Sequence, residues 1–382
     1  MTDTPPEPDR VAGYPHPRES PRLVGQAPAE RSFLEAWRAG RLHHAWLLRG
    51  PRGVGKATLA YRIARALIAA PADEPAGGLF GDATAGGAAV PETLDIPDGC
   101  PVMTRIRAGA EPRLAVLRRG LNDRGRPNTV IRVDEVRDLR RFLGLSAADG
   151  GWRAVIVDAA DEMNVQAQNA ILKMLEEPPA RTAFLMVSHS PAALLPTIRS
   201  RCRTLDLGPL APSDLALALA AAGAPVDEAE HGALAALAGG SVGAALRLIE
   251  GEGLDLCQRL VASLAGGSGV DRAAMIALAE TLGARGAEAR YALALDLILI
   301  VAGRLARHAA GLPIDIEVAR GEAALAARVA QHPAQAALWA DAASRIAANA
   351  AHARAVNLDP AQTIMDTLLD LDETLARARA AA

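Results

Sequence analysis

The sequence is poor in aromatic residues. Phe, Trp and Tyr make up 3% of its 382 residues, whereas apolar residues make up 50%. The cores must therefore be packed from Leu, Ala and Val with few large anchors, which favours helices over an all-β sandwich. At this length we expect a soluble protein of two or three domains, because single hydrophobic cores stop growing beyond about 250 to 300 residues.

Cysteine is also scarce. The chain has three cysteines, Cys100, Cys202 and Cys257. They are odd in number and far apart, which argues against a disulfide framework and against a structural zinc cage. We therefore predict a cytoplasmic protein without zinc.

Long apolar runs are missing as well. The most apolar stretch of the second half, residues 291–304, contains Asp296 and ends in Arg304, whereas a bilayer span needs about 20 apolar residues. We expect a buried helix there and no membrane partner. Residues 1–18 are rich in proline and charge and lack the apolar segment of a secretory signal. We predict a flexible tail over residues 1–20.

The charge balance gives no global attraction for nucleic acid. The formal net charge is −3, whereas proteins that bind phosphate backbones normally carry a strong basic excess. The densest basic segment, residues 118–153, has acidic residues interleaved with its arginines. That mixture favours a solvated, salt-bridged face over a DNA-binding patch. Any DNA contact must be local or shared with other subunits.

The first part of the chain alternates short β-like runs with helical patterns. Residues 45–48 precede a glycine-rich turn, and from Lys56 onward apolar residues repeat on one helix face. The apolar run 152–158 is typical of a strand buried on both faces of a parallel sheet, and further strands are predicted at 182–187 and 203–207. Repeated βα units of this kind imply a parallel, doubly wound sheet.

Changes in composition predict the domain organisation. Residues 71–99 and 120–128 are rich in Gly, Pro or Asp and are predicted to be surface loops. After Gly208 the pattern becomes Ala- and Leu-rich and helical. We therefore predict three domains after the tail: an α/β domain over 21–208, a small helical domain over 209–255 and a larger helical domain over 256–382.

A glycine-rich segment predicts phosphate binding. Residues 50–56, Gly-Pro-Arg-Gly-Val-Gly-Lys, fit the first seven positions of the Walker A pattern and lie between a predicted strand and a predicted helix. The backbone N–H groups of such a loop cradle phosphates, and its lysine reaches the outer phosphates. The candidate nucleotide-binding residues of the loop are Gly50, Gly53, Gly55 and Lys56. The alternative, a glycine-rich turn with an incidental lysine, is disfavoured by the flanking strand and helix.

The metal-binding position of this pattern is altered. A Ser or Thr hydroxyl should follow Lys56 and ligate Mg²⁺, but the residue there is Ala57. Thr58 is adjacent, yet one residue along a helix turns a side chain by about 100°. We expect weak ATP binding at most, with Mg²⁺ only alongside the nucleotide.

Asp158, at the end of a predicted strand, is the natural Walker B aspartate. The glutamate that polarises the attacking water should follow it, and that position is Ala159, so hydrolysis in cis lacks its base. Residues 133–135, Val-Asp-Glu, also look like a Walker B ending, but Arg132 interrupts the apolar run that a buried strand needs. We expect an edge or a helix start there.

Two later segments resemble bacterial DNA polymerase III clamp-loader subunits of the AAA+ family. One is the helical run 169–179, which ends in Leu-Glu-Glu-Pro-Pro, and the other is Ser200-Arg201-Cys202 after the next strand. The resemblance extends roughly over residues 20–260. It implies an α/β AAA+ P-loop domain with a parallel sheet and flanking helices, followed by a small helical lid domain and an all-α collar domain for oligomerisation.

The resemblance also assigns a role to Arg201. In that family the arginine of Ser-Arg-Cys enters a neighbouring subunit's ATP site as an arginine finger, so Arg201 is expected to be catalytic in trans. A planar, permanently charged guanidinium suits the charge that builds on the γ-phosphate. The alternative is that Arg201 forms a structural ion pair at a strand start.

A third part of the hydrolysis machinery is altered in the predicted lid. Residues 240–246 resemble the segment where motor subunits of the family place a nucleotide-sensing arginine, and that place is occupied by Gly243. Arg247, one helical turn later, fits an ordinary surface residue better than a displaced sensor. Motor subunits also carry a four-cysteine zinc module after the P-loop helix, and only Cys100 lies in the corresponding region.

The combination resembles the delta-prime type of clamp-loader subunit, a stator that donates a finger and turns over little or no ATP. The partners that this resemblance implies are the clamp-loader motor subunits, a delta-type subunit and, through the assembled complex, the sliding clamp and primer–template DNA. Two alternatives stay open. One is an ATP-hydrolysing motor subunit, and the other is a P-loop enzyme or AAA+ regulator unrelated to replication.

Overall fold

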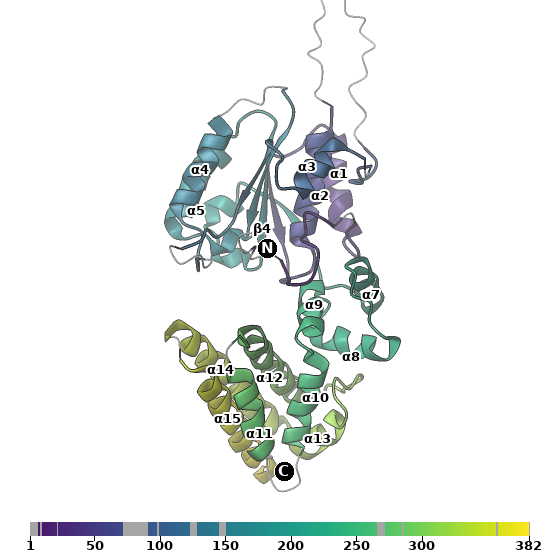
Figure 1. Cartoon of the computed structure of the whole chain (residues 1–382), viewed down its shortest axis with the longest axis vertical. Helices are drawn as coiled ribbons and strands as arrows, with labels where there is room; N and C mark the ends of the chain where they lie inside the picture. The colour runs from purple at the N-terminus through teal and green to yellow at the C-terminus, as the bar shows by residue number, and fades with distance from the viewer. Residues whose placement is uncertain are drawn as a thin grey trace, which may run out of the picture. The chain divides into compact units, whose positions relative to one another are not determined.

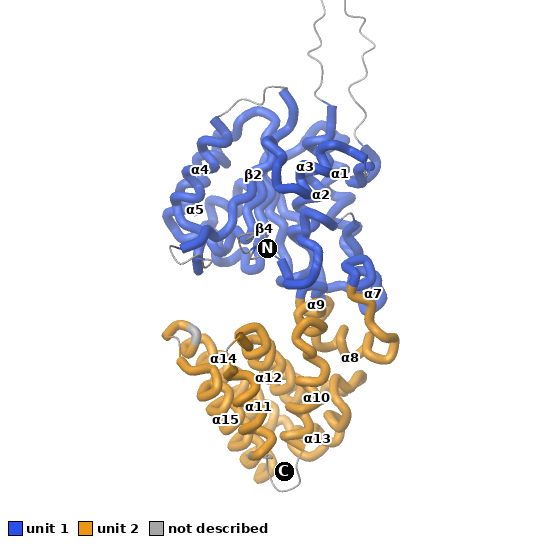
Figure 2. The backbone as a smooth tube through the Cα atoms, in the orientation of Figure 1, with its two compact units in different colours: residues 1–223, 241–243 blue, residues 224–240, 244–382 orange. Residues whose placement is uncertain are grey.

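The computed structural model of the chain describes residues 7, 10–20, 22–71, 91–97, 99–122, 128–144, 150–265, 272–284, 286–356 and 358–381. The chain divides into two compact units (Figure 2). Unit 1 comprises residues 1–223 and 241–243, and unit 2 comprises residues 224–240 and 244–382. The predicted boundaries after residues 208 and 255 stay predictions.

Unit 1 is built on a parallel sheet of five strands in the order β2-β3-β4-β1-β5. The strands are β1 (Ala45–Arg49), β2 (Leu114–Leu117), β3 (Arg153–Asp158), β4 (Thr182–Ser188) and β5 (Arg203–Asp206). All seven residues of β4 are buried, and only Asp158 at the end of β3 is partly exposed. The predicted fold class, an α/β P-loop domain with a parallel sheet followed by helices, is confirmed.

Helices cover both faces of this sheet. Figure 1 shows α1, α2 and α3 on one side and α4 and α5 on the other. The bounds of the helices in unit 1 are α1 (Ala27–Arg38), α2 (Lys56–Ala69), α3 (Pro101–Arg107), α4 (Val133–Gly144), α5 (Val165–Glu176), α6 (Pro196–Arg199) and α7 (Pro212–Ala221). Because the central strands are covered on both faces, β3 and β4 are continuous apolar runs rather than alternating ones.

Local sequence explains where these helices begin and end. The Asn164 side chain accepts a hydrogen bond from the Ala167 backbone N–H at 2.8 Å and so caps the start of α5. The following Pro178 and Pro179 cannot continue the helical hydrogen bonds, so α5 ends at Glu176. The Val-Asp-Glu segment at 133 is the first turn of α4, as expected for a helix start.

Two side chains in the segment before α1 make tertiary contacts, and the predicted flexible tail over residues 1–20 stays a prediction. His16 is fully buried, and its ring lies edge-on against Tyr61 at 5.6 Å between centroids. Arg18 forms an ion pair with Glu7 at 2.5 Å. A ring contact and an ion pair are not visible in a proline-rich composition. Residues 72–90 and 98 of the predicted insertion over 71–99, and residues 123–127 of the second predicted loop, lie outside the described residues.

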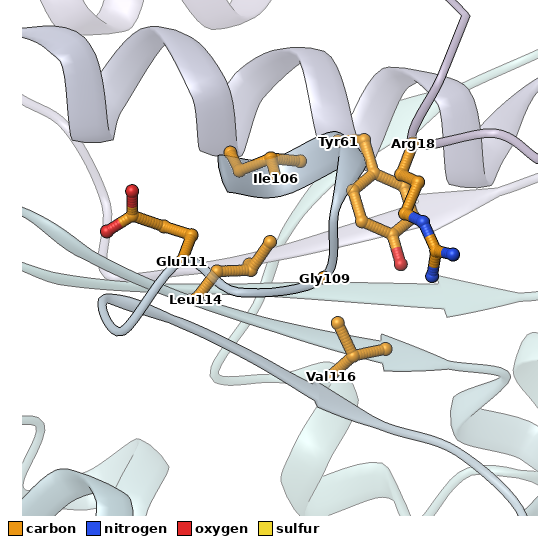
Figure 3. Close-up of a pocket in the computed structure, with 7 residues that line it drawn as sticks. All are labelled: Arg18, Tyr61, Ile106, Gly109, Glu111, Leu114 and Val116. Atoms are coloured by element: carbon orange, nitrogen blue, oxygen red, sulfur yellow. The ribbon is translucent and has the colours of Figure 1, made fainter. Parts of the chain in front are cut away.

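A small cavity lies between this segment and strand β2. Figure 3 shows Arg18 and Tyr61 at one end of it and Glu111 at the other, with Leu114 and Val116 from β2. Its volume of about 60 Å³ is far below the roughly 300 to 1,000 Å³ of a small-molecule pocket. It suits a few water molecules, not a nucleotide.

Unit 2 consists of helices. They are α8 (Glu228–Ala238), α9 (Val242–Glu250), α10 (Gly253–Leu264), α11 (Arg272–Gly283), α12 (Glu288–Ala309), α13 (Glu322–Val329), α14 (Pro333–Val356) and α15 (Pro360–Ala380). The helix expected over 291–304 is the middle of α12, with Leu297, Ile298 and Val301 buried. Trp339 is fully buried and donates its indole N–H to the Val329 carbonyl at 2.9 Å. In the described part of the chain no single helix is long and apolar enough to cross a membrane, and only α8 and α9 counted together as a bent pair meet that standard.

We predict that Gly50→Ala destabilises unit 1. A Cβ at Gly50 would lie 2.0 Å from the carbonyl oxygen of Leu207, a backbone atom that cannot move without shifting the end of β5. We expect the free energy of unfolding to fall by about 1 to 3 kcal/mol, as for other overpacked sites. The measurement is urea unfolding followed by circular dichroism.

Gly208→Ala is the matched control, because a Cβ at Gly208 meets no atom within 4 Å. Equal stability of the two variants would contradict the clash.

Candidate functional site

The parallel register brings the predicted nucleotide-binding residues to one edge of the sheet. Arg49, the last residue of β1, pairs with Ser188 at the end of β4, and Asp158 at the end of β3 pairs with Val187. The loop 50–55 leaves β1 at this carboxyl edge. Ligands of open parallel α/β sheets bind outside the carboxyl ends of the strands. This edge is therefore the candidate nucleotide site.

The loop after β1 has the backbone that its glycines predict. Gly53 and Gly55 have φ of +80° and +101°, which L side chains rarely adopt. Gly55 is the N-cap of α2, so the first turn of that helix, with its unpaired N–H groups and positive dipole end, begins at Lys56. A loop and helix N-terminus of this kind bind phosphate.

Lys56 is held inside the loop. Its Nζ donates to the Gly50 carbonyl at 2.7 Å and also to the Pro51 carbonyl, and the residue is 3% exposed. Burial lowers the pKa of Lys56 to about 8, although the negative charges of Asp158 and Asp161 act to raise it. The amine is thus positioned before any anion arrives, and a bound phosphate would replace part of the hydration that it lacks.

The segment 241–243 lies directly on this loop. The Ser241 hydroxyl donates to the Arg52 carbonyl at 2.8 Å, and the Gly243 N–H donates to the Gly53 carbonyl at 3.0 Å. A Cβ at Gly53 would lie 2.3 Å from Ser241 Oγ. The predicted place of a sensing arginine is therefore at the P-loop, and Gly243 contributes a backbone hydrogen bond there.

The sequence reasoning missed His189, which follows β4. Its backbone N–H donates to Asp161 Oδ1 at 2.9 Å. Burial and the positive charges of Lys56 and Arg52 lower the pKa of His189 to about 4, so the ring is neutral at pH 7. A Ser-His dipeptide matches no motif. Because His189 directly follows a predicted buried strand, its place at the carboxyl edge of the sheet could have been predicted from the sequence.

The acidic residues after Asp158 are already engaged. Glu162 forms ion pairs with Arg52 at 3.2 Å and with Arg119 at 3.0 Å, and Asp161 accepts the His189 N–H. Ala159 is buried and offers no carboxylate. Thr58 lies in the first turn of α2, one residue beyond the expected metal-binding position. The site has the groups that hold phosphates and lacks the glutamate that would orient a water.

Arg201 lies at the opposite edge of the same sheet. It lies between α6 and β5. The first residue of β5, Arg203, pairs with Trp46 near the start of β1, and its last residue, Asp206, pairs with Arg49 at the end of β1. The length of β5 alone separates the two edges by about 10 Å. The structure therefore brings Gly50, Gly53, Gly55, Lys56, Thr58 and Asp158 together and keeps Arg201 away from them.

The surroundings of Arg201 connect it to the other segment that carries the resemblance. Its Nη2 lies 2.9 Å from Glu176 Oε1, and its Nη1 donates to the Thr197 carbonyl at 3.0 Å. The side chain is 37% exposed. Cys202 is half-buried against Met186, and burial raises the pKa of its thiol to about 12, so Cys202 stays protonated and unreactive. The described residues contain no cluster of three or more His, Cys, Asp or Glu residues that could hold a metal ion.

Comparison with known proteins agrees with the sequence resemblance. Residues 89–211, about a third of the chain, match the family model described as DNA polymerase III, delta subunit. A 214-residue segment is 38% identical to DNA polymerase III subunit delta' of Pseudomonas aeruginosa, over 55% of this chain and 57% of that protein. The delta' subunit of Escherichia coli is 34% identical over 248 residues, 63% of this chain and 66% of that protein. This chain is related to the delta' subunits of DNA polymerase III.

The similarity to the delta' subunits extends over only part of each protein. The alignments cover less than two thirds of the length of these two delta' subunits. A solved structure, a gamma subunit-related protein of DNA polymerase III from Thermotoga maritima, aligns with 91% of this chain and 99% of that one at 17% identity and a TM-score of 0.35.

We predict that Lys56 makes stability depend on pH. Between its folded pKa of about 8 and its unfolded value near 10.5, the unfolded chain binds more protons than the folded one, so stability rises with pH in that window. Relative to Lys56→Met, the free energy of unfolding of the natural chain should rise by about 2 to 3 kcal/mol from pH 7 to pH 10. Urea unfolding of both chains at each pH measures this, and a constant difference would show that Lys56 is not desolvated.

Proposed function

We propose that this chain is a delta-prime-type stator subunit of the DNA polymerase III clamp loader. It helps to load the sliding clamp onto primed DNA in the cytoplasm by donating Arg201 to the ATP site of a neighbouring motor subunit. Its partners in this proposal are the motor subunits and a delta-type subunit, with the clamp and primer–template DNA engaged through the assembled complex. The chain itself hydrolyses little or no ATP.

One observation supports a role in trans most directly. Arg201 and Lys56 are at opposite edges of one sheet, so the guanidinium cannot reach a phosphate held by its own P-loop. A half-exposed arginine on the amino edge is available to another molecule. Charge stabilisation by such an arginine, supplied by a neighbour, accelerates phosphoryl transfer by about 10³- to 10⁵-fold in comparable systems.

Two features separate this proposal from an active motor subunit. Ala57 removes a metal-binding hydroxyl, and Ala159 removes the carboxylate that would orient water. The acidic residues that follow, Asp161 and Glu162, are engaged by neighbours. The relatives named as DNA polymerase III subunits favour the replicative role over an unrelated AAA+ regulator.

The P-loop supports a nucleotide-binding role that is separate from hydrolysis. Lys56 is already positioned by two carbonyls, and Gly53 and Gly55 keep the conformations that a phosphate cradle needs. We propose weak binding of ATP, with Mg²⁺ only alongside the nucleotide.

We predict that the isolated chain binds ATP without turning it over. Turnover should lie far below the ~1 to 10³ s⁻¹ that is common for enzymes, because both hydrolytic groups are missing. Titration calorimetry should detect weak binding that Lys56→Ala abolishes. Lys173→Ala, which removes an exposed lysine from α5, is the control and should leave binding unchanged. Turnover in the enzymatic range would mean that the chain is a motor.

We predict that Arg201→Ala lowers the DNA-stimulated ATPase of the assembled complex by at least about 10²-fold at the neighbour's site. Arg201→Lys should be nearly as damaging, because an ammonium group cannot reproduce the planar fork. Arg199→Ala, two residues away at the end of α6, is the control. The measurement uses complexes reconstituted with the cognate subunits, and thermal melting of each chain alone checks folding. Normal turnover with a lowered melting temperature would make Arg201 a structural residue.

A further inference from the structure

The ion pair between Glu176 and Arg201 joins the two segments on which the family resemblance rests. Glu176 is the last residue of α5, and Arg201 follows α6. The 2.9 Å contact between Arg201 Nη2 and Glu176 Oε1 links the end of one element to the end of the other across the amino edge of the sheet. We infer that Glu176 is a positioning residue, which orients the Arg201 guanidinium for the anion that it meets in a neighbouring subunit. This inference rests on the proposed role of Arg201 in trans.

The end of α5 is a firm support for this carboxylate. Met174 and Leu175 are buried in the core beneath it, and the Leu175 carbonyl is hydrogen-bonded to His44 Nε2 at 2.8 Å. Burial lowers the pKa of His44, with a further contribution from His43, so His44 is neutral at pH 7 and donates to that carbonyl. Pro178 then stops the helix. Glu176 therefore projects from a fixed backbone.

The guanidinium is held at two points and retains free donors. The Thr197 carbonyl accepts a hydrogen bond from Nη1, and the Glu176 carboxylate forms an ion pair with Nη2, so within the described residues one of the five N–H donors of Arg201 makes a hydrogen bond. The contacts come from two different elements, which fixes the plane of the fork. The remaining donors and the 37% exposure leave room for a planar, multidentate contact with phosphate oxygens.

Stability alone is a weak reason for this pair. The Arg201 and Glu176 side chains are 37% and 48% exposed, and ion pairs between such exposed groups contribute little to folding. The pair has a larger effect on function than on folding if it holds the Arg201 side chain in the rotamer in which the guanidinium acts. A free arginine loses rotamer entropy when it is immobilised at an interface, and one that is already oriented loses less.

The test measures ATP turnover in complexes reconstituted with the cognate motor and delta-type subunits, the sliding clamp and primed DNA. Glu176→Ala should lower kcat about two- to tenfold, the range expected when one side chain must be ordered anew, with the KM for ATP nearly unchanged. Glu176→Gln should recover part of the loss, because its amide oxygen still presents a partial negative charge and a hydrogen-bond acceptor beside the guanidinium. Glu177→Ala removes the same charge from the next, exposed residue and should have no effect.

A double variant separates positioning from other causes. In an Arg201→Ala background, Glu176→Ala should cause no further loss, because the effect of Glu176 passes through Arg201. A further loss of the same size would overturn the inference, and so would unchanged or increased turnover in Glu176→Ala alone. An increase would mean that Glu176 competes with the phosphate.

The outcomes also separate this inference from the proposed function. If Arg201→Ala lowers turnover and Glu176→Ala does not, only the positioning role fails. If Arg201→Ala itself leaves turnover unchanged, the proposed role in trans fails and the positioning role fails with it. The melting temperature of the Glu176→Ala chain alone should match that of the natural chain, and a loss of kcat that follows a large drop in melting temperature and is absent in Glu176→Gln would overturn the inference in favour of a structural role.

Discussion

The parallel pairing of β1 with β4 and β5 is the constraint on which both candidate sites depend. One register places the ends of β1, β3 and β4 together, so that the loop 50–55, Asp158 and His189 share the carboxyl edge. The same register puts the start of β5, and with it Arg201, at the amino edge. Because every strand runs the same way, a single chain presents a phosphate cradle on one edge and a guanidinium on the other.

Electrostatics differ sharply between the two edges. Lys56 is almost completely buried, with its pKa lowered by desolvation, and carbonyls of its own loop hold it. Arg201 is half-exposed and paired with a carboxylate in solvent. A buried amine interacts strongly with a phosphate that enters the same low-dielectric loop, whereas an exposed guanidinium gains its strength only after a partner excludes water from it. The first group is suited to binding within the chain, and the second is suited to action at an interface.

Sequence patterns predicted the sheet and its P-loop because buried parallel strands leave long apolar runs, as in 152–158 and 182–187. Strand β2 was missed, since Leu114–Leu117 is a short edge strand with little periodicity. The burial of His16 against Tyr61 and the place of His189 depend on tertiary contacts that no local pattern contains. The same holds for the Glu176–Arg201 pair: both residues stood in recognised motifs, but only the packing of α5 beside α6 brings them together.

Because the two edges are separate, changes at the P-loop need not affect the position of Arg201. Ala57 and Ala159 alter chemistry at the carboxyl edge only, and neither lies near the ends of α5 and α6 that hold Arg201. The backbone of the P-loop also contributes to the packing of unit 1, because Gly50 packs against Leu207 and Gly53 packs against Ser241. Packing in unit 1 therefore favours this loop conformation, with Lys56 and its two carbonyl contacts, independently of any water activation at the site. An intact cradle is thus weak evidence for turnover, and the carboxylate that should follow Asp158 is the more informative position.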